Sequence, residues 1–196
     1  MASALKEQLA SRFVKDGSSS DILTTGRQGS RNDKEPREGD LIGDEDSARH
    51  MRWREHWNAK TPVTELKPMS KPVHTVILTY TDSNPCQGVD ECDMAVRQLQ
   101  DNYQQNLNLP DIPYNFLVST DGNVYEGRGW DYRPFVPKKA FPRLRGSRIV
   151  IAQINVNFDD SILPPADSAT WDLIQFGINN DFIHSEAKKI VSAPWI

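Results

Sequence analysis

The aromatic residues of this 196-residue chain are confined to one part of it. Residues 1–50 hold 18 charged residues and one aromatic side chain, Phe13, whereas the other 16 aromatic residues, including all five Trp, follow residue 50. A segment this polar cannot bury enough apolar surface to offset the entropy that it loses on ordering. We therefore expect a disordered polar arm over 1–50 and a globular domain over 51–196.

Charge and hydropathy argue against nucleic-acid binding and against a membrane-spanning segment. The net charge of −4 lacks the basic footprint of a nucleic-acid-binding protein. No run of residues approaches the roughly 18 apolar positions of a membrane-spanning helix, and residues 1–14 lack the apolar core of a secretory signal. We expect no nucleic-acid partner and no membrane span in this chain.

The first half of the domain has strand and helix patterns in turn. Residues 73–80 (VHTVILTY) form a β-rich apolar run, which predicts a central strand. Asp90 is expected to cap the helix that follows a Ser/Asn/Pro loop. The apolar face of this helix is expected to comprise Ala95, Val96, Leu99 and Tyr103.

The second half predicts a hairpin, a strand and a helix. The hairpin joins 114–118 to 123–125, and Asp121-Gly122 between them favours a type I′ turn. Residues 149–158 predict a further strand, and the segment after Pro164-Pro165 predicts a helix. Its packed face is expected to contain Trp171, Ile174 and Ile178. This order indicates a mixed α/β domain, with a central mixed sheet flanked by helices.

The two cysteines, Cys86 and Cys92, are separated by five residues. This spacing excludes a four-ligand zinc knuckle, because no second pair exists. Two alternatives remain from the spacing: two reduced thiols at a loop-to-helix junction, or a disulfide that fixes the loop to the start of the helix.

A contiguous block, 111–116 (DIPYNF) followed by 121–130 (DGNVYEGRGW), resembles the signature of the peptidoglycan recognition proteins. These innate-immunity proteins are related to type 2 N-acetylmuramoyl-L-alanine amidases. Supporting matches are Arg52-Trp53 with Trp57, the strand segment 76–78, the Cys86/Cys92 spacing and the helix segment 173–177. The resemblance is nearest to the long, non-catalytic insect members.

The resemblance implies a central sheet flanked by helices and a groove for the glycan-peptide of bacterial cell wall. It also favours a Cys86–Cys92 disulfide over two thiols. Family domains continue past Ile196 with a Cys-Pro-Gly turn and a closing helix. We therefore expect a C-terminally truncated domain without that helix, in which another segment must cover part of a core face.

Zinc amidases of this family hold the metal with two His and one Cys. The positions that match the two His are Thr79, with Tyr80 beside it, and Ala193, and the chain ends before the Cys. The resemblance therefore implies no metal, no other cofactor and no amidase activity, although Tyr114 matches the Tyr that assists the reaction. The histidines present have no convincing ligand spacing: His50, His56, His74 and His184.

Ligand-binding residues implied by the resemblance are Tyr114, Arg128, Gly129 and Trp130. In the family, Gly-Trp at the last two positions accompanies a preference for diaminopimelic-acid peptidoglycan. Gly129 would let the backbone approach a stem peptide, Trp130 would offer an apolar wall, and Arg128 could bind a carboxylate bidentately. The residues themselves favour an alternative, in which the glycines shape the strand end and Trp130 fills the core.

The segment after Trp130 departs from the family pattern. Pro134, Phe135 and Val136 take the places of Gly, Ala and a ligand-contacting His. The basic stretch 138–145 that follows is either a solvated loop or a contact for a partner or an anionic wall polymer.

Two functions follow from these features. The first is a non-catalytic receptor that senses peptidoglycan and promotes immune signalling. The second is an interaction module that no longer binds peptidoglycan and regulates related receptors, or contacts signalling adaptors, by pairing with them. The family and the Cys pair point to an extracellular site or to a membrane-tethered longer isoform, and the lack of a signal peptide leaves an intracellular site open.

Overall fold

The computed structural model describes residues 51–154 and 165–195. The predicted arm over 1–50 and the end of the strand expected over 149–158 lie outside the described residues. Within the described ranges, no helix is both long and apolar enough to span a bilayer.

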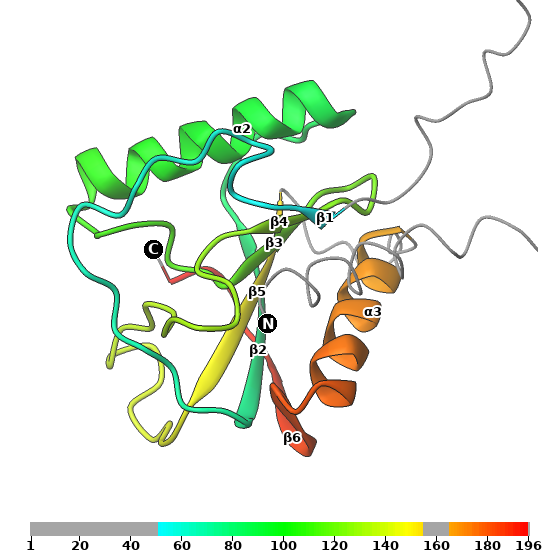
Figure 1. Cartoon of the computed structure of the whole chain (residues 1–196). Helices are drawn as coiled ribbons and strands as arrows, with labels where there is room; N and C mark the ends of the chain where they lie inside the picture. Colours follow the sequence, from blue (N-terminus) through cyan, green and yellow to red (C-terminus); the bar gives the residue numbers. More distant parts are fainter. Residues whose placement is uncertain (1–50, 155–164, 196) are drawn as a thin grey trace, which may run out of the picture.

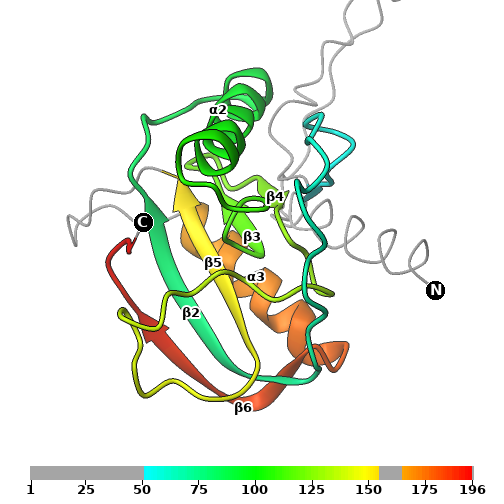
Figure 2. The same cartoon turned by 90° about the vertical axis from the view of Figure 1, so that its left-hand side faces the viewer.

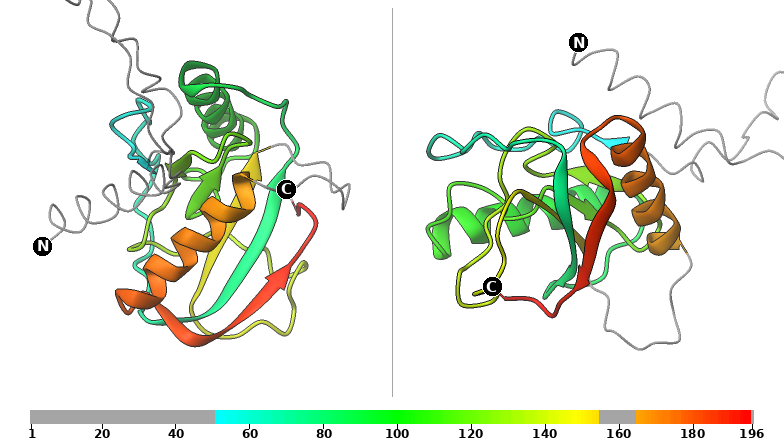
Figure 3. Two further views of the ribbon diagram at one scale, coloured as in Figure 1. Left: turned by 90° about the vertical axis from the view of Figure 1, so that its right-hand side faces the viewer. Right: turned by 90° about the horizontal axis from the view of Figure 1, so that it is seen from below.

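Six strands form one mixed sheet in the order β1-β4-β3-β5-β2-β6. They are β1 (Met51–Arg52), β2 (Val73–Thr81), β3 (Phe116–Val118), β4 (Val124–Glu126), β5 (Arg148–Ile154) and β6 (Ile183–Val191). The β3–β4 pair is antiparallel, and the other paired strands run parallel. Helices α2 (Val89–Asp101) and α3 (Pro165–Asn179) cover opposite faces of the sheet (Figures 1, 2 and 3). The expected mixed α/β fold is confirmed.

Alternation along the strands separates the core into two layers. Val76, Ile149 and Ile151 point towards α3, and the next residues along the same strands, such as Ile77 and Val150, point towards α2. The strands are apolar on both sides because helices cover both faces. The end of the α2 face is covered by a partly buried group of side chains from the later chain: Val136, Phe141, Leu144 and Trp195.

Helix α2 begins one residue before the expected cap. Gly88 occupies the N-cap position without a side-chain hydrogen bond, and Asp90 lies in the first turn. The prediction that Asp90 caps the helix is therefore wrong. Glu91 accepts a hydrogen bond from the backbone N–H of Gln87, the residue before the N-cap, at 2.9 Å, which ties the preceding loop to the first turn. A π-helical turn, η3 (Asn102–Asn106), follows and buries Tyr103.

The β3–β4 hairpin is present, but its turn differs from the prediction. Ser119 and Asn123 are joined by an N–H···O bond of 2.9 Å, which leaves three residues in the loop rather than two. Gly122 has φ of 88°, whereas Asp121 is not in the left-handed region. A type I′ turn needs positive φ at both central residues, so this prediction is wrong, and the loop is of the three-residue class with glycine at its last position.

Helix α3 packs on the sheet with a face rotated from the expected one. Trp171 is 48% exposed, so the prediction that it lies on the packed face with Ile174 and Ile178 is wrong. Ile174 is buried and Ile178 packs at the edge of the core. The buried residues of this helix are Ala169, Thr170, Leu173, Ile174 and Phe176.

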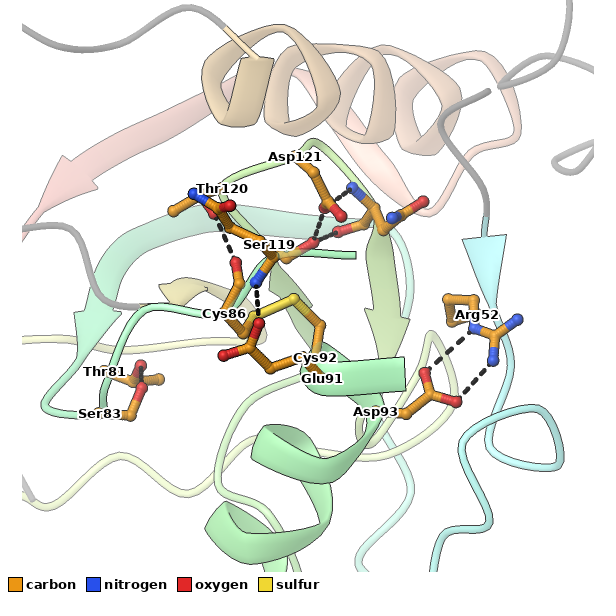
Figure 4. The surroundings of a disulfide bond; sticks show 12 residues. Arg52, Thr81, Ser83, Cys86, Glu91, Cys92, Asp93, Ser119, Thr120 and Asp121 are labelled. Atoms are coloured by element: carbon orange, nitrogen blue, oxygen red, sulfur yellow. Dashed lines mark hydrogen bonds and ion pairs between the residues drawn. A yellow bond between two sulfur atoms is a disulfide. The ribbon is translucent and has the colours of Figure 1, made fainter. Parts of the chain in front are cut away.

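The disulfide that the resemblance implies is present between Cys86 and Cys92. Both cysteines are buried, and Figure 4 shows the bond at the start of α2. The Thr120 hydroxyl donates to the Cys86 carbonyl at 2.9 Å, and Arg52 forms an ion pair with Asp93 at 2.6 Å. The disulfide therefore lies between the hairpin loop, β1 and α2.

Removing this disulfide is expected to lower the free energy of unfolding by about 2 kcal/mol, because the closed loop is short. The measurement is urea unfolding of the Cys86→Ser/Cys92→Ser double variant beside the wild-type chain. Wild-type protein in reducing buffer should match the variant. Equal stability of all three samples would contradict the expectation.

Candidate functional site

A pocket of about 430 Å³ lies between the segment that follows β1 and the segment that follows β4. Charged side chains of both signs line it: Arg54, Glu65, Asp111, Glu126, Arg128 and Asp131. Gly129, Trp130 and Tyr132 complete the wall on the β4 side. The structure thus brings three of the four expected ligand-binding residues, Arg128, Gly129 and Trp130, to one pocket.

Arg128 is almost fully buried and holds the backbone of two segments together. Its Nε donates to the Ile112 carbonyl at 2.6 Å, and its Nη1 donates to the Arg133 carbonyl at 2.8 Å. Its Nη2 lies 3.4 Å from the Asp111 carbonyl. Burial lowers the pKa of Arg128 to about 10, while the charge of Asp111 acts in the opposite direction. Much of the guanidinium's donor capacity is therefore used inside the protein.

Gly129 has φ of 60°, a conformation that glycine adopts without strain. A Cβ at this position would lie 2.8 Å from Oε1 of Glu126. The backbone beyond it is fixed by the buried side chain of Asn115, whose Nδ2 donates to the carbonyls of Gly129 at 2.7 Å and Tyr132 at 2.9 Å. Asn115 Oδ1 accepts from the Val150 N–H at 2.9 Å, which joins this turn to β5.

The Trp130 indole packs into the α3 side of the core. Its ring centroid lies 4.7 Å from that of Phe116, 4.9 Å from that of Phe182 and 6.2 Å from that of Phe176. The side chain is 9% exposed, and its Nε1 has no hydrogen-bond partner. Trp130 therefore fills the core while its accessible edge contributes to the pocket.

An ionic network forms the floor of the pocket. Arg54 Nη1 lies 2.9 Å from Oδ2 of the fully buried Asp111 and donates to the Gly127 carbonyl at 2.6 Å. Asp111 Oδ1 accepts from Gln100 Nε2 at 2.7 Å and from the Ile112 N–H at 2.8 Å. The buried carboxylate is paired and hydrogen-bonded, as burial of a charge requires.

Tyr114 lies outside this pocket, on the α2 side of the sheet. Its hydroxyl is 3.0 Å from that of Tyr103, and its ring meets the Trp195 ring edge-on with a centroid distance of 6.4 Å. Trp195 also packs edge-on against Phe141 at 5.3 Å. Burial raises the pKa of Tyr114 and of Tyr103, so both hydroxyls are neutral in the fold.

This tyrosine pair predicts a loss of stability in alkali. Unfolded tyrosines ionise near pH 10, so the free energy of unfolding should be unaffected by these groups below about pH 10. It should fall as pH rises from there towards the raised folded-state pKa, by up to about 1.4 kcal/mol per pH unit for each hydroxyl. Thermal melting between about pH 9 and 11 measures this slope. The Tyr103→Phe/Tyr114→Phe variant should flatten it, and an unchanged slope would contradict the assignment.

The positions implied for zinc ligands lie at one end of the sheet. Leu78 of β2 pairs with Val191 of β6, so Thr79 and Ala193 lie just beyond the last β2–β6 pair, and Thr79 itself pairs with Ala152 of β5. Thr79 Oγ1 is buried without a hydrogen-bond partner, and Ala193 offers no donor atom. These residues do not fit zinc, which prefers Cys, His and carboxylate ligands. Over 51–154 and 165–195, no three His, Cys, Asp or Glu residues form a group that could hold a metal ion.

The histidines lie at two other places in the described structure. His74 and His184 stack across β2 and β6 with ring centroids 4.8 Å apart, and His56 Nδ1 accepts from the Trp53 N–H at 3.3 Å. His50 lies outside the described residues.

Sequence reasoning assigned no role to several residues that build the pocket. Arg54 and Glu126 are 72 positions apart, and the Arg54 N–H lies 3.3 Å from Oε2 of Glu126. Asp111 and Asn115 belong to the signature block, but that block alone does not reveal their partners. The spacing of charges along the chain carried no signal for these contacts, which depend on the parallel pairing of β1 with β4.

The fold and this pocket define a class of protein, the amidase-type α/β domain with a signature turn after its hairpin. Curated relatives are similar to this chain in sequence. Peptidoglycan recognition protein 1 of Rattus norvegicus is 38% identical over 90 residues, or 46% of this chain and 49% of that protein. Peptidoglycan recognition protein 3 of Mus musculus is 36% identical over 130 residues, or 66% of this chain and 36% of that protein. Peptidoglycan-recognition protein LA of Drosophila melanogaster is 39% identical over 82 residues, or 40% of this chain and 22% of that protein.

Solved structures with a similar fold are also peptidoglycan recognition proteins. The ectodomain of the Drosophila transmembrane receptor PGRP-LCa has a TM-score of 0.62 and 29% identity, covering 70% of this chain and 81% of that one. Human PGRP-IBETAC, in complex with glycosamyl muramyl pentapeptide, has a TM-score of 0.63 and 28% identity, covering 72% of this chain and 82% of that one. PGRP-LE in complex with tracheal cytotoxin has a TM-score of 0.65 and 25% identity, covering 72% of this chain and 81% of that one.

The curated relatives and the similar solved structures of this chain are peptidoglycan recognition proteins. No family model matches the chain. The chain spans about half or less of the length of the curated relatives named above.

Proposed function

We propose that this protein is a non-catalytic peptidoglycan recognition protein of innate immunity that binds a muropeptide of the diaminopimelic type and promotes immune signalling. The observation that carries the proposal is the pocket of about 430 Å³ at the signature turn, where Arg128, Gly129 and Trp130 meet. Its volume suits a short stem peptide. Solved relatives include one in complex with tracheal cytotoxin, a monomeric diaminopimelic-acid-type peptidoglycan.

The charges of the pocket support the diaminopimelic type. The side-chain end of diaminopimelic acid carries an ammonium and a carboxylate, whereas that of lysine carries an ammonium alone. Glu65 lines the pocket, is exposed and has no ion pair among the described residues, so it can receive an ammonium. The guanidinium of Arg54 is paired with Asp111, but its side chain is 24% exposed and lines the same pocket, so a carboxylate could approach it. A zwitterionic end would be complemented at both charges.

Residue chemistry at the sheet end supports the absence of amidase activity. Thr79 and Ala193 replace the nitrogen ligands that the resemblance implies, and Trp195 packs over Tyr114 there. We expect no hydrolysis of a muropeptide when the chain is incubated with zinc, measured by release of the stem peptide. Zinc-dependent release would contradict this part of the proposal.

Calorimetric titration of the full chain with muropeptides tests binding. A diaminopimelic-type muropeptide should bind with a Kd of about 1 µM to 100 µM, and a lysine-type one about tenfold more weakly. Glu65→Gln should reduce this preference, because the ammonium loses its partner. Glu186→Gln is the matched control, since Glu186 is exposed on β6 and does not line the pocket. If a folded protein gives no heat of binding with either muropeptide, direct recognition of peptidoglycan is overturned.

A second function is favoured by the internal bonds of the same residues. Arg128 is engaged with backbone carbonyls, and the Trp130 ring lies largely in the core, so both residues have structural roles that do not involve a ligand. These contacts suit an interaction module that pairs with related receptors or signalling adaptors without binding peptidoglycan. In that case the muropeptide titrations give no heat of binding, and mixing with a related receptor ectodomain yields a complex in analytical ultracentrifugation.

A further inference from the structure

A second cavity, of about 740 Å³, lies under the loop between β4 and β5. The loop, residues 133–147, crosses the α2 side of the sheet, and in Figure 2 its yellow-green trace passes in front of β2 and β5. We call this space the basic cavity. Four cationic side chains line it, Arg133, Lys138, Arg145 and Arg148, and its described lining includes no Asp or Glu.

The walls of the basic cavity are held by backbone contacts. The Arg133 N–H donates to the Lys67 carbonyl at 2.9 Å, and the Phe135 N–H donates to the Pro113 carbonyl at 2.9 Å. Two turns close the loop further along, through the Ala140 N–H at 3.0 Å and the Leu144 N–H at 3.1 Å. The loop is therefore a formed structure, and its cations are presented in a fixed frame.

The positive charges of the cavity are not neutralised within the described chain. The ion pairs among the described residues use other cations, Arg52, Arg54, Lys60 and Lys71. Arg133 and Arg148 each donate to a backbone carbonyl, of Pro68 and Gly146 respectively. Burial lowers the pKa of Arg148, and the neighbouring charge of Arg133 lowers it further. The cavity therefore gathers four cations without a counter-ion among the described residues, an arrangement that an anion would complement.

The remaining lining indicates what the anion is attached to. Proline and phenylalanine side chains form the apolar part of the wall: Pro134, Pro137, Phe141 and Pro142. Such surfaces pack against the C–H faces of a sugar ring, while guanidinium groups bind a phosphate with paired hydrogen bonds. A single phosphate is far smaller than this cavity, whereas a phosphorylated sugar is of the size that pockets of this volume hold.

We propose that the basic cavity is a binding site for a phosphorylated sugar, distinct from the pocket at Arg128–Tyr132. The phosphate contacts the cations, with Lys138 and Arg145 closing over it, and the sugar ring lies on the proline and phenylalanine wall. This proposal does not depend on muropeptide binding.

Titration of the full chain with glucose 6-phosphate tests the site, with glucose and inorganic phosphate as partial ligands. Glucose 6-phosphate should bind with a Kd of about 1 mM or tighter, more strongly than either part, and more weakly as salt rises. The Lys138→Gln/Arg145→Gln variant should weaken binding at least about tenfold. Lys139→Gln/Arg143→Gln is the matched control: both residues are exposed on the same loop, neither lines the cavity, and binding should stay within about twofold.

Other probes distinguish a free phosphorylated sugar from a phosphate-bearing polymer. They also distinguish a sugar ligand from a nucleic acid or a lipid surface. Tighter binding of poly(glycerol phosphate), sensitive to the Lys138/Arg145 variant alone, would support the site and assign it to a phosphate-bearing wall polymer. Tighter binding of a single-stranded oligonucleotide or of phosphatidylglycerol vesicles would overturn the proposal. Equal weakening in the two loop variants would also overturn it, because binding would then follow overall charge. All four substituted residues are exposed, so unchanged melting curves are expected for both variants.

Discussion

Replacing Trp130 by alanine is expected to lower the free energy of unfolding by about 3–5 kcal/mol. The indole packs among Phe116, Phe176 and Phe182, and its removal leaves a cavity that the sheet and α3 cannot close. Guanidinium chloride unfolding measures the loss. The experiment also matters for recognition, because a Trp130→Ala protein that no longer binds a muropeptide has first to be shown to be folded.

Trp171→Ala is the matched control, since this indole is largely exposed on α3 and contacts only Lys189 at 5.3 Å among its described ring contacts. A cation–π contact of this kind contributes about 0.5–1 kcal/mol. Similar losses in the two variants would show that Trp130 does not have the packing described above. Trp130→Phe keeps an aromatic ring in the core and is the better variant for ligand titrations.

Replacing Asp111 by alanine is expected to lower the free energy of unfolding by about 2–3 kcal/mol. The carboxylate is fully buried and serves three partners, Arg54, Gln100 and the Ile112 N–H. Without it, the buried amide of Gln100 and the backbone donor lose their acceptor, and Arg54 keeps a charge without a counter-ion. Urea unfolding at neutral pH measures the effect.

Asp101→Ala provides the comparison, because Asp101 also pairs with a cation, Lys60, but both side chains are exposed. Exposed pairs contribute about 0–1 kcal/mol. A loss at position 111 no larger than that at position 101 would mean that the floor of the pocket is solvated and that Asp111 has no special role there.

The central strands could be predicted because their residues are apolar on both faces. β2, β5 and the hairpin strands lie between two helical layers, and this arrangement leaves a continuous apolar run in the sequence. β6 could not be predicted in this way. It lies at the edge of the sheet, and most of its side chains are half-buried or exposed without a regular alternation. Its strand conformation therefore depends on pairing with β2, which periodicity does not reveal.

The orientation of α3 shows a second limit of prediction from sequence periodicity. Apolar residues occur on more than one side of this helix, and periodicity alone favoured the side with Trp171. Close packing on the sheet instead buries the side with Ala169, Leu173 and Phe176 and leaves Trp171 largely exposed. The hairpin turn was missed for a similar reason, since Asp-Gly is compatible with both a two-residue and a three-residue loop.

Of the candidate site, the signature block located the turn but not its partners. Arg128, Gly129 and Trp130 are neighbours in sequence and lie at one pocket, whereas Tyr114 faces the other side of the sheet. The ionic floor depends on Arg54, which reaches Asp111 only after β1 pairs with β4. Contacts between distant segments of this kind follow from topology, and a single sequence does not specify them.

The outer edge of β6 has a consequence for the behaviour of the protein at high concentration. In the sheet that the structure describes, β6 pairs with β2 on one side, and its other side has no strand. Unpaired edges are templates for intermolecular strand addition, and charged side chains are a common protection against it. Lys188 and Lys189 are both exposed here, and Lys189 also covers the ring of Trp171. We therefore expect these two lysines to oppose intermolecular strand addition at this edge and so to keep the protein soluble at high concentration.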